Sequence, residues 1–262
     1  MNSLYCRLSK ADRNKRLEVK LVRIDDENPE SSFCQTFELS HQVYKKYQMS
    51  IHGDSESKCN EKDFRRFLCS PPFTEINSTQ EYGGFHQQYY IDGKLVAVGV
   101  LDILPWCVSS VYFYYDPDYS ALSFGTLSAL YEIHLTQQLH NKCPMIRWYY
   151  MGFYIHSNPK MKYKSKFSPS FLLCPQSYSW HPIKQCLEEL EKNKFCIFNK
   201  NHSELMEITE EDLNSLKVLV DRRVCSYSVY KNVSSVDEYK DILQLLVKHV
   251  GLENAKNICI YS

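Results

Sequence analysis

The charged side chains of residues 95–187 separate into an acidic group and a basic group. From Leu95 to Ile133 there is no lysine or arginine, and the acidic side chains are Asp102, Asp116, Asp118 and Glu132. Carboxylates can accept a proton or pair with a cation. From Ile133 to Leu187 there is no aspartate or glutamate, and the basic side chains are Arg147 and the lysines at positions 142, 160, 162, 164, 166 and 184. The formal net charge of zero for the whole chain conceals this polarity.

Part of the basic group has a regular spacing that could bind phosphate. The lysines at alternate positions are Lys160, Lys162, Lys164 and Lys166, interleaved with Met161, Tyr163 and Phe167. In an extended segment all four would lie on one side, which suits a phosphate backbone, and an aromatic ring would be available for a terminal base. A plain basic loop is the alternative. The neutrality of the chain argues only against a large nonspecific nucleic-acid surface.

Hydrophobic periodicity and turn residues predict the elements that position these side chains. Strands are predicted over residues 17–24, 83–91, 95–104, 108–115 and 146–155, and helices over residues 35–49, 63–69, 122–140, 183–193, 212–220 and 235–251. Asp92-Gly93 is a hairpin signal, and Pro71-Pro72 ends the second helix. The order hairpin, strand, helix, strand predicts a mixed sheet with a crossover helix, hence an α/β (α+β) fold.

Cysteine usage and hydropathy limit the class of protein. The eleven cysteines are scattered, and no two lie within four residues of one another, so no C-x-x-C pair exists to bind a metal. Scattered cysteines and a basic first segment without an apolar core predict reduced thiols in the cytoplasm and nucleus. No run of about 18 apolar residues occurs, so we expect no membrane span.

A set of consecutive stretches carries a specific family resemblance. They are residues 85–89 (FHQQY), 93–100, 102–105 (DILP), 108–119 (VSSVYFYYDPDY), 149–157 (YYMGFYIHS), 159–164 (PKMKYK) and 173–175 (LCP), with 43–52 and 64–69 upstream. Together they closely resemble the C-terminal catalytic region of eukaryotic arginyl-tRNA–protein transferases. The resemblance implies a GNAT-like acyltransferase fold, which agrees with the predicted element order. We expect a basic remnant at residues 1–34, the catalytic domain at residues 35–200 and a mostly helical extension at residues 201–262.

The resemblance also implies a reaction. The α-amine of a protein that begins with Asp, Glu or oxidised Cys attacks the ester of arginyl-tRNA. The resulting N-terminal arginine marks that protein for ubiquitin-dependent degradation in the N-degron pathway. The ester is already activated and the amine is partly neutral near pH 7, so positioning can replace a covalent nucleophile. We therefore expect Cys107, Cys143 and Cys174 to be small buried hydrophobic residues. The expected partners are arginyl-tRNA and proteins with acidic N-termini, without DNA or membrane, and the chain is expected to be a monomer.

Site residues follow from the substrates that the resemblance implies. An arginyl group needs a carboxylate partner, and an acidic N-terminus needs cations. The expected catalytic residues are Asp102, Glu132, His86 and Gln88. The expected arginine- and ester-binding residues are Asp102, Asp116, Glu132 and Gln87. The expected tRNA-binding residues are Lys160, Lys162, Tyr163, Lys164 and Lys166. The expected residues for the acidic N-terminus are Arg65, Arg66, Lys45 and Lys46.

Each of these assignments has a structural alternative. Asp102 could make a structural hydrogen bond, Asp116 could form an Asx turn, and Glu132 could be a solvated surface side chain. The four cations could form solvated helix faces. Strand alternation places His86 and Gln88 on one face and Gln87 on the other, and a solvent-facing edge strand is the alternative.

The chain departs from the family pattern in three places. The family usually has an N-terminal domain whose cysteine cluster binds a metal or iron–sulfur centre. We expect that domain to be missing here, as in a fragment or short isoform, and expect no cofactor in this chain. Tyr131 stands where the family helix often has Arg, and Trp106 where Asn is usual.

Two other functions compete with the transferase. A truncated, inactive module could bind tRNA or acidic N-termini without turnover. An acyl-CoA N-acyltransferase is less favoured, because residues 120–126 (SALSFGT) lack the glycine-rich loop that would bind a pyrophosphate at the start of the helix.

Overall fold

The computed structural model describes the chain except for residues 1–15, 72–81, 201–207, 221–222, 234–238 and 262. Residues 1–15 of the basic remnant predicted at residues 1–34, and Pro72 of the predicted helix stop Pro71-Pro72, therefore lie outside the described residues. Contacts divide the chain into two units, residues 1–153 and residues 154–262. The domain boundaries expected from the sequence stay predictions.

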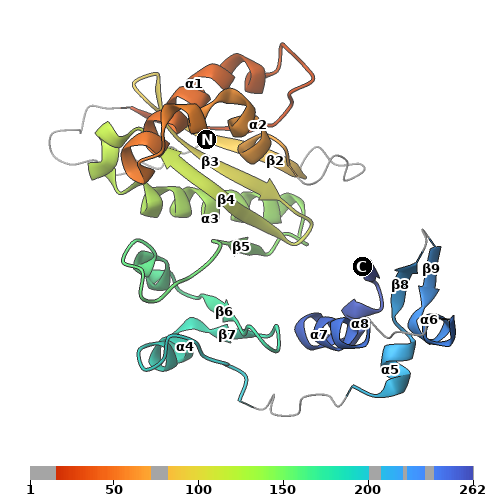
Figure 1. The fold of residues 1–262 in the computed structure, drawn as a ribbon. Coiled ribbons are helices and arrows are strands. Elements are labelled where there is room, and N and C mark those ends of the chain that lie inside the picture. Colours follow the sequence, from red (N-terminus) through yellow and green to blue (C-terminus); the bar gives the residue numbers. More distant parts are fainter. Residues whose placement is uncertain (1–15, 72–81, 201–207, 221–222, 234–238, 262) are drawn as a thin grey trace. The chain divides into compact units, whose positions relative to one another are not determined.

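A five-stranded mixed sheet organises the first unit (Figure 1). In spatial order its strands are β1 (Leu17–Arg23), β2 (Gly83–Ile91), β3 (Lys94–Ile103), β4 (Cys107–Tyr115) and β5 (Trp148–Tyr150). The first four run antiparallel to their neighbours, and β5 runs parallel to β4. Asp92 and Gly93 both have positive φ, 50° and 82°, as a two-residue hairpin turn requires. The predicted mixed α/β sheet is confirmed and is consistent with a GNAT-like fold.

Helices cover both faces of this sheet (Figure 1). On one face lie α1 (Ser32–Tyr47) and α2 (Glu61–Leu68), and on the other lies the crossover helix α3 (Phe124–Lys142). Short helices η2 (Gln48–His52), η3 (Glu56–Cys59) and η4 (Pro117–Leu122) connect these elements. Every residue of β2 is buried, because helices pack against both of its sides.

Strand register decides which side chains share a face. Residues opposite one another in paired strands point to the same side of a sheet. His86 and Gln88 lie opposite the valines of β3 that pack beneath α1, and Asp102 continues this row. Gln87 lies opposite Gly99 on the face that α3 covers. The predicted separation of His86 and Gln88 from Gln87 is therefore confirmed.

Two predicted elements of the first unit differ from the structure. The strand expected over residues 146–155 is only β5, because it pairs with just the first three residues of β4 and the backbone turns at Gly152, φ 79°. The helix expected over residues 122–140 is α3, shifted by two residues. No helix among the described residues is long and apolar enough to cross a membrane.

The first part of the second unit is a hairpin with a short helix on each side. In chain order the elements are η5 (Lys162–Lys166), β6 (Phe171–Leu173), β7 (Trp180–Pro182) and α4 (Ile183–Leu190). The two strands pair antiparallel. Residues 161–180, for which the sequence predicts no helix or strand, therefore contain regular structure.

The rest of the second unit has its own three-stranded sheet. Its elements are α5 (Glu210–Asn214), β8 (Lys217–Val220), β9 (Arg223–Ser226), α6 (Tyr227–Val233), α7 (Lys240–Val250), α8 (Leu252–Ala255) and β10 (Cys259–Tyr261). The strand order is β10-β8-β9. The single helix predicted over residues 212–220 is wrong. Thr209 and Asp212 form a capping box that starts α5, but the helix ends at Asn214 and the chain continues as a strand.

Candidate functional site

The parallel strands β4 and β5 part after three residue pairs. Cys107 pairs with Trp148, and the last pair joins Ser109 to Tyr150. Beyond Ser109, no strand of the described residues continues on that side of β4. The backbone N–H and C=O groups of an unpaired strand edge can bind an extended ligand. This β4–β5 junction is therefore a place where an extended ligand can be held.

Asp102 lies beside this junction on the face where α1 and α2 pack. It is opposite Ser109, which is in turn opposite Tyr150 on β5. Asp102 is half-buried, and no hydrogen bond or ion pair joins its carboxylate to any residue that the structure describes. Burial raises the pKa of Asp102. The structural hydrogen bond considered from the sequence is absent among these residues, and the carboxylate can receive a proton or a cation.

Glu132 lies beside the same junction on the opposite face. It is 1% exposed on α3, and its Oε2 accepts a hydrogen bond of 2.6 Å from the Tyr149 hydroxyl on β5. The alternative of a solvated surface side chain is therefore wrong. Gly99 of β3 lies directly beneath, and a Cβ there would be 3.2 Å from Oε1 of Glu132. A residue without a side chain lets this carboxylate pack against the sheet.

Gln87 belongs to the polar group around Glu132. Its Oε1 accepts a hydrogen bond of 2.6 Å from the hydroxyl of Tyr89, a side chain with no exposed area. Burial first and the charge of Glu132 second raise the pKa of Tyr89 well above its ordinary value. The tyrosine is therefore neutral and acts as a hydrogen-bond donor.

The register thus places the two predicted carboxylates on opposite faces of one sheet. Asp102 belongs to the row of His86, whereas Glu132 packs over Gly99 on the other side. The structure does not bring them together in one pocket. Both nevertheless flank the β4–β5 junction, because Tyr150 and Tyr149 are adjacent residues of β5 that point to opposite faces.

His86 and Gln88 have partners in the helices above the sheet. The His86 ring is fully buried, and Nε2 lies 2.9 Å from the carbonyl oxygen of Leu68. Burial lowers the pKa of His86 to about 4, so the ring is neutral and Nε2 donates. Gln88 donates to Thr36 of α1 at 2.8 Å and accepts from Tyr90 at 2.7 Å. These contacts fix α1 and α2 to the sheet, and a catalytic role for either residue stays a prediction.

Asp116 is engaged in a network of ion pairs. Its buried carboxylate lies 2.5 Å from Nζ of Lys46 and 3.0 Å from Nζ of Lys94, and it accepts the backbone N–H of Asp118 at the start of η4. Burial is the largest influence and raises the pKa of Asp116, but the hydrogen bonds from both lysines and Asp118 outweigh it, and the pKa is lowered. The Asx-type turn is confirmed. The arginine-binding role of Asp116 stays a prediction.

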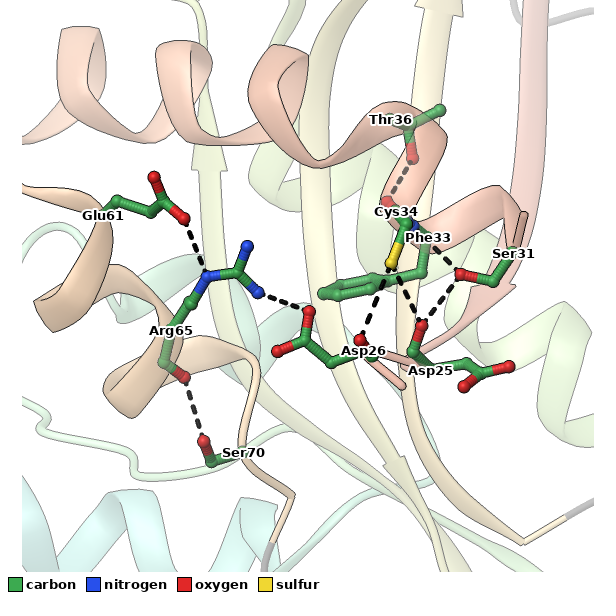
Figure 2. A network of polar contacts seen from close by, with 9 residues as sticks. All are labelled: Asp25, Asp26, Ser31, Phe33, Cys34, Thr36, Glu61, Arg65 and Ser70. Carbon is green, nitrogen blue, oxygen red and sulfur yellow. Dashed lines mark hydrogen bonds and ion pairs between the residues drawn. The ribbon is translucent and has the colours of Figure 1, made fainter. Parts of the chain in front are cut away.

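The cations predicted for an acidic N-terminus mostly have acidic partners within the chain. Figure 2 shows the Arg65 guanidinium between Asp26 and Glu61, 2.9 Å from the latter, where it ties the segment after β1 to α2. Lys45 lies 2.5 Å from Glu56. Arg66 is different, because its side chain is 81% exposed and its ion pair with Asp63 is 3.2 Å long. Of the four predicted cations, Arg66 has the most accessible charge.

The lysines predicted for tRNA lie in the second unit and are not extended. Residues 162–166 form the 3₁₀ helix η5, and Lys160 lies in the preceding turn. A 3₁₀ helix has three residues per turn, so side chains two positions apart point about 120° apart. The predicted single row is therefore wrong. Lys160, Lys162 and Lys166 are exposed, whereas Lys164 is half-buried. The ring of Tyr163 contacts that of Phe167, with centroids 6.5 Å apart.

The three cysteines kept out of catalysis have different environments. Burial raises the pKa of the half-buried Cys107, and Cys143 is also half-buried. Cys174 is fully buried as expected, yet its pKa is lowered to about 6. Burial is the largest influence and opposes this shift. It is outweighed by hydrogen bonds from the Ser177 side chain and from backbone groups of residues 176, 177 and 199. The spacing of hydrophobic residues in the sequence did not indicate the lowered pKa of Cys174.

No group of three His, Cys, Asp or Glu side chains within the described ranges is arranged to hold a metal ion.

Comparison with known proteins identifies what the chain is similar to. Residues 39–174 match the family model described as "Arginine-tRNA-protein transferase, C terminus". The chain is 41% identical over 251 residues to arginyl-tRNA–protein transferase 1 of Drosophila melanogaster, which covers 93% of this chain and 51% of that protein. It is also 41% identical over 194 residues to arginyl-tRNA–protein transferase 1 of Arabidopsis thaliana, covering 71% of this chain and 29% of that protein.

A bacterial relative extends the similarity. Aspartate/glutamate leucyltransferase of Polynucleobacter asymbioticus is 31% identical over 134 residues, covering 50% of this chain and 50% of that protein. The chain spans about half the length of the Drosophila relative and less than a third of the Arabidopsis one.

Proposed function

The chain belongs to the arginine-tRNA-protein transferase family through the C-terminal region of that family, and from this premise we propose that it is an aminoacyltransferase that moves arginine from arginyl-tRNA to a protein α-amine. The observation that carries the proposal is the Asp102 carboxylate beside the β4–β5 junction, half-buried and with no ion pair to any of the described residues. A reaction between an amine and an ester needs a proton acceptor of this kind.

The opposite placement of the two carboxylates suggests separate tasks for them. With the ester at the junction, the amine approaches from the Asp102 face, and the arginyl side chain extends toward the Glu132 face. A C–N bond forms and the ester C–O bond breaks. Asp102 accepts a proton from the attacking nitrogen, and the departing ribose oxygen takes up a proton to become a hydroxyl. Glu132 supplies the negative charge that a guanidinium needs.

The test is transfer of labelled arginine from arginyl-tRNA to a peptide that begins with Asp. We expect Asp102→Asn to lower kcat by about 10²- to 10⁴-fold, the usual contribution of a general base. Glu132→Gln should raise KM for arginyl-tRNA, because the guanidinium loses its ionic partner. The matched control is Asp118→Asn, since Asp118 is an acidic residue of the same segment whose side chain is 69% exposed.

The pH profile distinguishes a base from a merely structural carboxylate. Because burial raises the pKa of Asp102, the wild-type rate should increase with pH through that raised value. Asp102→Asn should lose this limb of the profile. An unchanged kcat and profile in Asp102→Asn would overturn the assigned role.

A second candidate function is a module that binds tRNA or acidic N-termini without transferring arginine. The partial match to the relatives favours it. The chain corresponds to 51% of the Drosophila relative, so a part of that protein outside the match could be needed for transfer. Retained tRNA binding with no transfer by the wild-type chain would support this candidate and sink the enzyme.

We further propose the substrates and setting that the resemblance implies. The acceptors are proteins with N-terminal Asp, Glu or oxidised Cys, and arginylation marks them for degradation in the cytoplasm and nucleus. The exposed charge of Arg66 supports a contact with an acidic N-terminus. Competition between peptides beginning with Asp and with Asn tests this preference, because these side chains have similar shapes and different charges.

A further inference from the structure

Three large aromatic side chains are exposed around the β4–β5 junction. Trp106 is 58% exposed, Trp148 59% and Tyr150 41%. Trp148 and Tyr150 alternate along β5, so both point to the face of Asp102. The carbonyl of Trp106 accepts hydrogen bonds from the backbone N–H groups of Arg147 and Trp148, 3.0 and 3.3 Å long, which hold this residue at the start of β5.

Two of these rings belong to the edge strand of the sheet. β5 is the last strand of the sheet, and it contributes two exposed aromatic residues in only three positions. Tyr149 between them is half-buried and bonded to Glu132, so only the rings on the Asp102 face are presented to solvent. A cluster of exposed aromatic residues on a soluble fold marks a binding surface.

Two exposed cations precede the rings of β5 in the chain. They are Arg147 and Lys142, and Asp102 supplies a half-buried carboxylate on the face of the rings. Nε of Arg147 donates to the carbonyl of Pro144 at 3.2 Å, which orients the guanidinium. Exposed aromatic rings beside cations are the features that bind single-stranded nucleic acid, because bases stack on the rings and phosphates pair with the cations.

A cavity beside Arg147 lies on the α3 side of the sheet, opposite the face of Trp148 and Tyr150. It has a volume of about 420 Å³ and is lined by Thr136, Gln137, His140, Asn141, Ile146 and Arg147. Its amide, imidazole and guanidinium groups can hydrogen bond to a ribose, a phosphate or a base edge. A nucleic-acid strand that passes around β5, the edge strand of the sheet, can therefore reach both the rings and this lining.

We propose that Trp148 and Tyr150 form a stacking platform for the unpaired 3′ end of the aminoacyl-tRNA, with Arg147 binding the adjoining backbone. This inference rests on the proposed function, because it gives the donor substrate a place. The ester lies on the ribose of the terminal nucleotide, so the stacked base must lie close to the reacting carbon. Asp102 and Tyr150 are two strand spacings apart, about 10 Å, which the terminal ribose and the ester can span.

Binding of deacylated tRNA to the full chain tests the platform without requiring transfer. Two probes are compared, an arginine-accepting tRNA with its terminal adenosine and the same tRNA without it. Removing one stacked base typically costs 1–3 kcal/mol, so Trp148→Ala and Tyr150→Ala should each weaken binding of the intact tRNA by about 5- to 150-fold. Neither variant should weaken binding of the shortened tRNA.

Matched variants separate stacking from folding. Trp148→Phe keeps a flat ring and should retain most of the affinity, whereas Trp180→Ala removes an equally exposed tryptophan, 55% exposed, from the β6–β7 hairpin and should change nothing. The chain has only three tryptophans, at positions 106, 148 and 180. In a Trp180→Phe background, intact tRNA should therefore quench the remaining fluorescence, and the shortened tRNA should not.

Several results would overturn the platform. Equal losses for both tRNAs in Trp148→Ala would mean that the surface does not bind the terminal base. Loss of affinity for an Asp-peptide with unchanged tRNA affinity would assign the surface to the protein substrate. If the wild-type chain transfers arginine and Trp148→Ala transfers it equally well at low tRNA concentration, the platform fails while the proposed function stands. If the wild-type chain transfers nothing, the binding measurements still decide the platform.

Discussion

Asp102 and His86 show how burial acts on individual titratable residues. Both belong to the same row of the sheet, and burial disfavours the charged form of each. The pKa of the acid is therefore raised and that of the base is lowered. Asp102 lies beside an open strand edge, whereas His86 is sealed beneath α1 and α2. Access from solvent, more than residue type, makes Asp102 the better candidate for chemistry.

The buried His86 predicts a specific pH dependence of stability. Its pKa is about 4 in the folded chain against an ordinary value of 6.5, so the unfolded chain binds the extra proton between these values. The neutral His86 ring stabilises the folded chain fully when the pH is above the ordinary pKa of 6.5. This stabilisation is lost as the pH falls toward 4. Between about pH 7.5 and pH 5, wild type should lose about 2 kcal/mol more stability than His86→Asn.

Urea unfolding at both pH values measures this difference. Pulse hydrogen–deuterium labelling of peptides from β2 and β3 restricts the readout to the sheet that contains His86. His249→Asn removes an exposed histidine from α7 and should leave the pH dependence unchanged. Equal pH dependence in wild type and His86→Asn would contradict the neutral, buried ring.

Asp116 connects several elements. It links α1 through Lys46, β3 through Lys94 and the start of η4 through the backbone of Asp118. β5 has fewer partners. It pairs with only three residues of β4 and ends where that pairing ends. Contacts with other elements therefore determine where a helix or strand lies and how far it extends.

Substitution of Asp116 tests whether it is a structural or a substrate-binding group. Asp116→Asn keeps a turn-forming side chain but loses both ion pairs, and exposed lysine partners contribute about 0–1 kcal/mol each. We expect a loss of about 1 kcal/mol for Asn and about 2 kcal/mol for Ala, which also removes the cap. A structural role alone predicts an unchanged KM for arginyl-tRNA. A raised KM with unchanged stability would instead support the arginine-binding role.

At the scale of the whole molecule, the chain is neutral but its charge is unevenly distributed along the sequence. The first unit contains the acidic segment that ends at Glu132, and the second begins with the lysine-rich turn at residues 160–166. A neutral total is therefore compatible with a local phosphate-binding surface, because electrostatic attraction acts over about 10 Å at ordinary salt.

The exposed lysines of this turn predict the salt dependence of tRNA binding. Changing Lys160, Lys162 and Lys166 together to Gln should lower affinity and reduce the slope of log K against log salt by about 2–3. Lys184, Lys192 and Lys194, changed together to Gln, provide a control with the same charge difference from the next segment. An unchanged slope in the first triple variant would remove this turn from the tRNA-binding surface.

The sequence by itself determined the α/β class, the hairpin at Asp92-Gly93, the crossover helix and the family. These features depend on local signals, namely alternation, turn residues and consecutive family stretches. It also determined that His86 and Gln88 share a face and Gln87 does not, because side-chain alternation is a local property of a strand. The family model and the relatives confirm the resemblance.

Only the tertiary structure decided which of these residues meet. Asp102 and Glu132 are both acidic residues of one segment, yet register and the packing of α3 put them on opposite faces. Burial of Glu132, the ion pairs of Asp116 and Arg65, and the exposure of Trp148 depend on partners far away in the chain. Sequence periodicity fixes the direction of a side chain within its element, but the environment it enters is set by another element.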